Sequence, residues 1–397
     1  MTKKQNLDKD KLRILLWSAC PWTKVGYGTQ AKGIAEAMLD LGHEVAFQSL
    51  FGLLGASINW KGVPIYPARN HPLGWDVVES NARHFGADLI VSFYDIWALP
   101  LDICGTIKTP WAAMTPVDGT PVQEVTVLRL QQVTYPVAFA RDSLKLMQEA
   151  ELNDATYIPL GIDCNVFKPS SKQAARDALD IPQDCYLMTM IAANKGFPCR
   201  KSFPEVLQAF ARFRTCHPEA ILYLHSTRKP FGSSGNGIYF DAIIDDLEIP
   251  RSSVAFAPEN ELVVGVPDEQ MAQIYQASDV LLSPSMGEGF GLPIAEAQAC
   301  GCPVITQDCS AMSELTINGI ACKPLTRWWQ PGLNYWWQLA DVNAIRDAME
   351  RLYCQPADVA QENARQGAEY IKNVYSWDVV RDMYWKPFLE RVREELW

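Results

Sequence analysis

The chain has 397 residues, of which 48% are hydrophobic, which allows two ordinary domains with their own cores and excludes global disorder. Its formal net charge of −11 argues against a protein that coats nucleic acid through general positive charge, although a local basic groove is compatible with it. The 11 cysteines form no CxxC pair and only 5 histidines accompany them, so free thiols are favoured over a zinc site.

The polar stretch 1–11 lacks the apolar core of a secretion signal. The apolar segment 89–104 is interrupted by Asp95, Pro100 and Asp102, which makes it too short to span a bilayer. We therefore expect a cytoplasmic protein with reduced thiols and no transmembrane segment.

Short β-rich runs alternate with helical patterns through the first part of the chain. This alternation predicts a parallel sheet with crossover helices. The expected strands are 13–18, 44–48, 88–93, 111–114, 137–140 and 156–158, and the expected helices are 30–41 and 75–85.

A polar segment with Pro169 and two serines, 167–172, interrupts this pattern and indicates a linker. The alternation then restarts, so we expect a domain at 1–168, a second at 169–375 and a helical end at 376–397. The expected strands are 186–192, 220–225, 254–257, 280–283 and 304–306, and the expected helices are 203–217, 239–247, 268–277, 294–300, 342–353, 358–373 and 377–397.

The segment from Glu288 to Glu296 places two carboxylates eight positions apart across a glycine-rich turn, with Pro293 suited to a helix start. A strand, a tight loop and a helix start would offer backbone N–H groups and a positive helix end to an anion. The carboxylates can accept hydrogen bonds from hydroxyls. The alternative is purely structural: Glu296 complements the helix dipole and the glycines only make the turn. Phosphate beside hydroxyls is the chemistry of a nucleotide sugar.

Residues 284–305 resemble the signature of the family 4 (group 1) retaining glycosyltransferases of the GT-B fold. The resemblance implies two Rossmann-like parallel-sheet domains facing a cleft, with the C-terminal helix crossing back to the first domain. It implies that Glu288 contacts the donor sugar and that Glu296 binds the ribose hydroxyls. The backbone expected to hold the diphosphate is that of Gly289, Phe290, Gly291 and Leu292. The donor would be a UDP- or GDP-linked sugar, with no tightly bound cofactor.

A basic loop follows the first expected strand of the second domain and contains Asn194, Lys195, Arg200 and Lys201. The resemblance implies that Lys201 and a second cation neutralise the leaving pyrophosphate. The family's arginine position falls on Asn194 or Lys195, so Arg200 is the candidate substitute. The alternative is a solvated loop carrying ordinary positive charges.

The first helix opens with Gly26 and Gly28, and with Ala31 this formally matches a dinucleotide-binding fingerprint. A dinucleotide fold is disfavoured because seven residues separate the strand from Gly26, and no acidic residue ends the second strand. In the glycosyltransferase interpretation, this loop reaches toward the donor phosphates and the acceptor.

Two carboxylates, Asp95 and Asp118, follow expected strands, where parallel sheets bind ligands. Asp118 lies where related enzymes often have a histidine, so it is a candidate for the reaction centre. Turn capping by a short acidic side chain explains both equally well.

Segment 327–338 contains four tryptophans and does not read as a regular element. Exposed aromatic rings can stack on sugars or bases, but packing onto the core is the favoured explanation.

These features predict a metal-independent retaining glycosyltransferase acting on a glycan, a lipid-linked glycan or a small molecule. The alternatives are the same chemistry on a nucleic acid such as a modified DNA base, a GT-B epimerase, and a non-catalytic binder.

Overall fold

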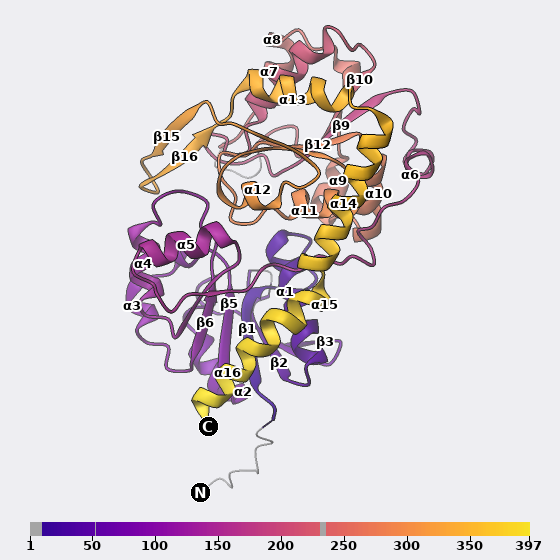
Figure 1. Ribbon diagram of the computed structural model, residues 1–397. Helices are drawn as coiled ribbons and strands as arrows, with labels where there is room; N and C mark the ends of the chain where they lie inside the picture. The colour runs from indigo at the N-terminus through magenta and orange to yellow at the C-terminus, as the bar shows by residue number, and fades with distance from the viewer. Residues whose placement is uncertain (1–9, 52, 231–235) are drawn as a thin grey trace, which may run out of the picture. The chain divides into compact units, whose positions relative to one another are not determined.

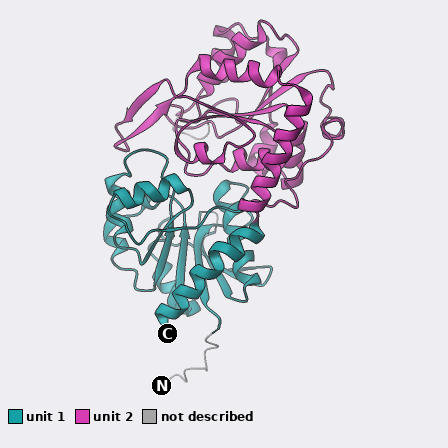
Figure 2. Cartoon of the chain, viewed as in Figure 1, with its two compact units in different colours: residues 1–161, 377–397 teal, residues 162–376 magenta. Residues whose placement is uncertain are grey.

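The computed structural model describes residues 10–51, 53–230 and 236–397, so most of the stretch 1–11 discussed above lies outside the described residues. The chain divides into two compact units, residues 1–161 with 377–397 and residues 162–376 (Figure 2). The division precedes the expected boundary after residue 168 because the following segment packs within the second unit. There the N–H of Ile162 donates to the carbonyl of Tyr375 at 2.7 Å, and Phe167 packs on Tyr275.

The first unit is built on a sheet with the strand order β3-β4-β2-β1-β5-β6-β7-β8, in which only the β3–β4 pair is antiparallel among the described residues (Figure 1). The parallel sheet is confirmed, whereas β3 and β4 were not predicted. The strands are β1 Arg13–Ala19, β2 Glu44–Leu50, β3 Ile58–Trp60, β4 Val63–Tyr66, β5 Leu89–Phe93, β6 Trp111–Met114, β7 Tyr135–Ala138 and β8 Thr156–Tyr157. The helices are α1 Gly26–Asp40, α2 Val78–Phe85, α3 Leu101–Cys104, α4 Glu124–Leu130, α5 Arg141–Glu149, α15 Trp377–Val380 and α16 Lys386–Leu396.

Successive side chains of β1 point to opposite faces of this sheet, and both faces are buried. Leu15 and Trp17 belong to a buried cluster that includes residues of α2, α4 and α5, whereas Ile14 and Leu16 point to the opposite face and are also buried. Burial on both faces explains why the strands read as continuous apolar runs rather than as alternating ones.

The C-terminal segment belongs to the first unit. Trp377 is inserted so closely that a Cβ at Gly33 or Gly161 would lie 2.1 or 2.3 Å from its indole. Farther on, Tyr135 donates a 2.7 Å hydrogen bond to Glu395, and Trp385 is fully buried. The final helix expected at 377–397 is interrupted by a π-helical turn at Arg381–Trp385.

The second unit contains a parallel sheet in the order β11-β10-β9-β12-β13-β14. Its largest cluster of buried side chains joins α7, α8 and α13 to one face of the sheet. The strands are β9 Tyr186–Ile191, β10 Ala220–His225, β11 Val254–Phe256, β12 Val280–Ser283, β13 Val304–Gln307 and β14 Gly319–Cys322. The helices are α6 Lys172–Ala178, α7 Phe203–Arg214, α8 Phe240–Asp246, α9 Glu259–Val264, α10 Asp268–Ala277, α11 Leu292–Ala299, α12 Ser310–Leu315, α13 Val342–Tyr353 and α14 Ala357–Tyr375.

The tryptophan-rich segment is a β-hairpin, which corrects the expectation of an irregular element. Strands β15 (Thr326–Gln330) and β16 (Tyr335–Leu339) pair antiparallel, with Trp328 opposite Trp337 and Trp329 opposite Trp336. Packing was expected for the aromatic side chains, and it holds for one face: Tyr335 and Trp337 are buried in a cluster with Met286.

Among the described residues, none of the helices combines the length and the apolar character needed to cross a membrane.

Candidate functional site

The second unit has its topological switch point between β9 and β12. The chain runs from β9 outward through β10 and β11, and from β12 outward through β13 and β14 on the other side. Loops that leave two such neighbouring strands diverge and open a crevice at their carboxyl ends, where open α/β sheets bind ligands. The basic loop follows β9 and the Glu288 loop follows β12, so the fold brings the two strongest sequence signals to one edge.

The centre of this edge is an ion-paired cluster formed by Glu288 with Arg200 and Lys201. Arg200 lies 3.2 Å from one carboxylate oxygen and also donates to the carbonyl of Gly287, while Lys201 bonds the other oxygen. The Glu288 side chain is 10% exposed, against 25% for Arg200 and 23% for Lys201. The carboxylate is therefore held rigidly, and two cations remain in reach of a ligand.

The ionisation of Glu288 follows from this pairing. Burial alone would raise its pKa, but the charges of Lys201 and Arg200 and the hydrogen bonds from Lys201 and Ser285 lower it to about 2. Glu288 is consequently a carboxylate throughout the physiological pH range, able to accept hydrogen bonds from hydroxyls and unable to donate a proton.

The loop from Gly289 to Leu292 leads into α11. Gly291 has a φ of 105°, a left-handed conformation that favours glycine, and it precedes the first residue of the helix. The backbone N–H groups of Gly289, Phe290, Gly291 and Leu292 meet no acceptor among the residues that the structure describes. Buried backbone donors are almost always satisfied, so donors grouped at a helix N-terminus indicate an anion site.

Glu296 lies in the second turn of α11, where Tyr275 of α10 donates a 2.8 Å hydrogen bond to its Oε2 atom. Burial raises the pKa of Glu296 to about 7, against the hydrogen bond from Tyr275, which lowers it, and with the negative charge of Asp268 adding to the rise. The two carboxylates that bracket the loop therefore differ in ionisation, which the sequence did not indicate.

Several supporting residues were missed by the sequence analysis. The backbone N–H of Glu288 donates to Oγ of Ser310 at 3.0 Å, and the N–H of Met286 donates to the carbonyl of Arg200 at 2.8 Å. Gln307, fully buried, donates to the carbonyls of Pro284 and Ser285 at 3.1 and 2.8 Å. No spacing or composition signal in a single sequence marks such side chains, since each acts across strands that are distant along the chain.

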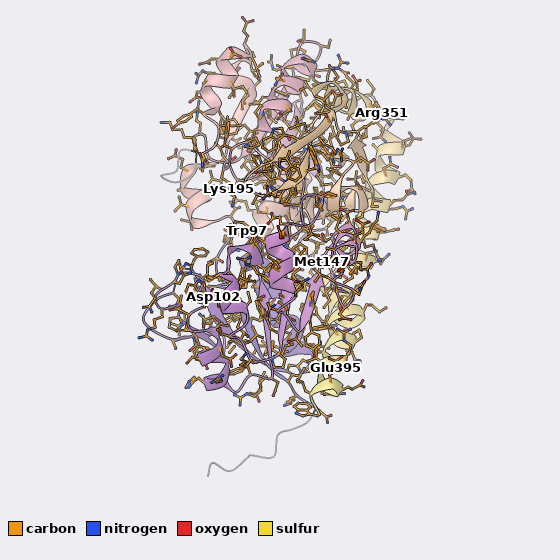
Figure 3. All side chains as sticks on the ribbon, turned by 90° about the vertical axis from the view of Figure 1, so that its left-hand side faces the viewer. Trp97, Asp102, Met147, Lys195, Arg351 and Glu395 are labelled. Atoms are coloured by element: carbon orange, nitrogen blue, oxygen red, sulfur yellow. The ribbon has the colours of Figure 1, made fainter. Side chains whose placement is uncertain are left out.

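The other two residues of the basic loop are placed differently from the cation pair. Asn194 is buried, and its amide bonds the carbonyls of Thr227 and Ile238 and the N–H of Ile238. These bonds use its polar atoms to hold a neighbouring loop. Lys195, labelled in Figure 3, is exposed, and the ion pairs of Glu288 involve only Arg200 and Lys201 among the described residues.

The remaining predicted residues belong to the first unit. A Cβ at Gly28 would lie 2.1 Å from Oγ1 of Thr23, so the loop after β1 packs directly on this glycine. Gly26 is the exposed first residue of α1. Tyr27 donates a 3.0 Å hydrogen bond to Asp95, which ties the N-terminal turn of α1 to the loop after β5 at this unit's own switch point. Asp118 follows β6 and is half-buried.

Within the described ranges, no group of three or more His, Cys, Asp or Glu side chains is placed to hold a metal ion.

Comparison with known proteins identifies the relatives of this fold and site. Residues 248–355 match the family model described as "Glycosyl transferases group 1". The D-inositol 3-phosphate glycosyltransferase of Streptosporangium roseum is 31% identical over 161 residues, 41% of this chain and 35% of that protein. The protein of the same name from Rhodococcus erythropolis is 27% identical over 299 residues, 72% of this chain and 62% of that protein. The resemblance to group 1 glycosyltransferases is therefore confirmed.

Solved glycosyltransferase structures superpose on nearly the whole chain. Sucrose-phosphate synthase from Thermosynechococcus elongatus superposes with a TM-score of 0.76 at 18% identity, covering 96% of this chain and 99% of that chain. Anabaena HepE in complex with UDP-glucose superposes with a TM-score of 0.69 at 16% identity, covering 97% and 99%. The expected GT-B class of two Rossmann-like units is confirmed.

The matched regions span between 35% and 62% of the lengths of the two curated relatives named above.

Proposed function

We propose that this protein transfers a sugar from a nucleoside diphosphate sugar to a hydroxyl acceptor with retention of anomeric configuration. The observation that carries the proposal is the arrangement at the switch point of the second unit. There, an ionised carboxylate and two cations lie beside four backbone donors that meet no acceptor within the described part of the chain. A pyrophosphate flanked by hydroxyl-bearing groups matches this set of charges and donors.

Each group has a role in donor binding. The N–H groups from Gly289 to Leu292 and the positive end of α11 would bind the diphosphate, with Arg200 and Lys201 as its counter-ions. Glu288 would accept hydrogen bonds from the transferred sugar. Glu296 would accept hydrogen bonds from the ribose.

The position of Asn194 supports a different role from direct donor contact. Because its amide holds the backbone of Thr227 and Ile238, we assign it to positioning the loop beside the site. The exposed Lys195 would contribute at most a screened charge.

The proposed chemical step develops negative charge next to the two cations of this site. The bond between the anomeric carbon and the diphosphate oxygen breaks, and Arg200 and Lys201 stabilise the negative charge that develops on the phosphate oxygens. The acceptor hydroxyl oxygen bonds to the anomeric carbon from the face that the diphosphate leaves. Its proton passes to a phosphate oxygen, so the products are a glycoside and a nucleoside diphosphate, and no protein base is required.

The nucleotide is proposed to be UDP. Structures of Anabaena HepE, which have the same fold, contain UDP or UDP-glucose, and a further structure of this fold from E. coli contains UDP-2-fluoro glucose. The names of the relatives point to a hydroxylated acceptor that carries an anionic group, such as an inositol phosphate. We further propose that the first unit contributes Asp118 and the first turn of α1, with Gly26 and Gly28, to acceptor recognition.

A donor panel tests the proposal. The protein would be incubated with UDP-, GDP- and ADP-glucose, with thermal stabilisation and nucleotide release followed by mass spectrometry, with and without acceptor alcohols. We expect UDP-glucose to stabilise the wild type and not the Glu296→Ala variant, and nucleotide release to rise with acceptor. Absence of stabilisation by every donor would refute the donor site, and acceptor-independent conversion of the sugar would indicate an epimerase.

A further inference from the structure

The β15–β16 hairpin of the second unit has an outer face that the proposed donor site does not use. Alternation and register place Trp328, Tyr335 and Trp337 on the packed face, and Arg327, Trp329 and Trp336 on the other. Trp329 is 40% exposed, although large aromatic side chains usually seek burial. One aromatic face of the hairpin therefore packs on the core, and the other is exposed.

The open face is an ordered surface rather than a set of independent side chains. The rings of Trp329 and Trp336 meet edge to face, with centroids 5.1 Å apart, and the Arg327 guanidinium lies 4.9 Å from the centroid of Trp336. These contacts fix three side chains before a ligand arrives, which lowers the entropic cost of binding. We call Arg327, Trp329 and Trp336 the outer aromatic face.

The charge of this region indicates the kind of ligand. Residues 315–340 contain Lys323 and Arg327 and no acidic residue, in a chain whose net charge is −11. Among the described residues, no carboxylate forms an ion pair with Arg327. A fixed cation that stacks on an aromatic ring and forms no ion pair within the described ranges suits an anionic group carried on a ring-shaped ligand.

The hairpin is also joined directly to the loop that carries Glu288. The N–H of Gln338 donates to the carbonyl of Met286 at 2.9 Å, and the buried Gln307 bonds both the carbonyl of Gln338 and that of Ser285. Met286 precedes Glu288 by two positions, so the outer aromatic face belongs to the same rigid support as the candidate donor site.

We propose that the outer aromatic face binds an acidic saccharide chain that forms part of the acceptor. An apolar face of a sugar ring stacks on Trp329, and a carboxylate or phosphate substituent binds Arg327. This inference rests on the proposed function only in calling the saccharide an acceptor. A nucleic-acid strand is disfavoured because two cations supply little phosphate neutralisation, and such binding depends on many phosphate contacts.

The test is direct binding, measured by calorimetry without any donor. The probes are trigalacturonate, its carboxyl-reduced neutral counterpart, and an oligothymidylate of similar length. We expect trigalacturonate to bind most tightly, and Trp329→Ala and Arg327→Gln each to weaken it by about tenfold. Arg327→Gln should also remove the preference for the acidic over the neutral trisaccharide. Trp397→Ala, which removes another exposed tryptophan at 46% exposure, is the matched control and should leave binding unchanged.

The outcomes separate this proposal from the donor proposal. Tighter binding of oligothymidylate, equal binding of the neutral trisaccharide, or no binding of trigalacturonate would overturn the acidic-saccharide site. Folding of the variants is checked by their thermal unfolding, since both substituted side chains lie on the outer face. If UDP-glucose fails to stabilise the wild type while trigalacturonate still binds, the donor proposal falls and the saccharide site stands.

Discussion

The phenol of Tyr275 donates its hydrogen bond to Glu296 across the interface between α10 and α11, at 2.8 Å. Tyr275 is fully buried, and burial raises the pKa of its phenol, so it stays a donor at neutral pH. This bond partly offsets the cost of ionising Glu296 in its buried position. The pair therefore sets the pH at which the carboxylate becomes available to a ligand.

Affinity for UDP-glucose is predicted to rise with pH between about 6 and 8. Glu296 titrates with a pKa of about 7, and only its ionised form accepts two hydrogen bonds from ribose hydroxyls. UDP-glucose is the right probe because its diphosphate does not titrate in this range, unlike that of UDP. Calorimetric Kd values at a series of pH values give the midpoint.

Tyr275→Phe should move that midpoint to higher pH, because the variant loses the bond that lowers the pKa of Glu296. Asp268→Asn should move it to lower pH, because it removes a charge that raises this pKa. The control is Glu296→Gln, in which the pH dependence should vanish. A midpoint identical in all of these variants would contradict the assignment.

Glu288→Ala is predicted to lower kcat by about 100-fold or more, because it removes a preorganised charge from the reacting sugar. The fold should persist, since Arg200 and Lys201 remain 25% and 23% exposed and can be solvated. Affinity for UDP should be unchanged or increased, because the two cations lose their competing carboxylate. Wild-type transfer rates in this variant would refute the role of Glu288.

The pKa of Glu288 also gives a stability prediction. Its pKa falls from 4.5 to about 2 in the folded protein, so its contribution is present above pH 4.5 and is lost as pH falls through 2. Urea unfolding at pH 6 and pH 3 should therefore show a smaller acid-induced loss of stability in Glu288→Gln than in the wild type. An equal loss in both proteins would show that the ion pairs contribute nothing to folding.

Lys201→Ala should reduce kcat/KM by about 100-fold, whereas Lys195→Ala should change it less than about threefold. Both lysines lie in the same loop, but Lys201 pairs with Glu288 and Lys195 is exposed (Figure 3). Steady-state kinetics with varied UDP-glucose measures both. Comparable losses would mean that general positive charge, rather than position, is what the loop supplies.

Much of this site was predictable because it depends on strand order and local turns. Apolar runs alternating with helices indicate a parallel sheet, and the loops after β9 and β12 then meet at one edge. The family resemblance implied that Arg200 and Lys201 act at the same site as Glu288, and the structure pairs all three side chains. The tight turn predicted from the loop glycines is also present, and Gly291 adopts a left-handed φ of 105° in it.

The rest depends on contacts between residues that are distant in sequence. Asn194 was expected to bind the donor, and the sequence did not indicate that its amide bonds the backbones of Thr227 and Ile238. The tryptophan-rich segment looked irregular because Pro331 and Gly332 suggested a break. These residues instead form the hairpin turn, with Asn334 at a φ of 56°. Cross-strand pairing decides such cases, and one sequence does not display it.

Transfer is predicted to be insensitive to chelation, with activity in excess EDTA within about twofold of the untreated rate. The physical reason is that Arg200, Lys201 and the N-terminus of α11 supply the positive charge that a divalent ion supplies in other glycosyl transfers. Loss of activity in EDTA that returns on adding Mg²⁺ or Mn²⁺ would contradict this and would require carboxylate ligands that the proposed mechanism does not use.

Gly161→Ala is predicted to destabilise the first unit by about 1–3 kcal/mol, the usual cost of overpacking. The new methyl group would lie 2.3 Å from the indole of Trp377. The indole has no room to move away, because Gly33 lies so close to the same ring that a Cβ there would be 2.1 Å from it. Gly105→Ala is the matched control, since its nearest neighbour would be 3.8 Å away. Urea unfolding measures both variants. If Gly161→Ala is as stable as Gly105→Ala, the C-terminal segment is not anchored through Trp377.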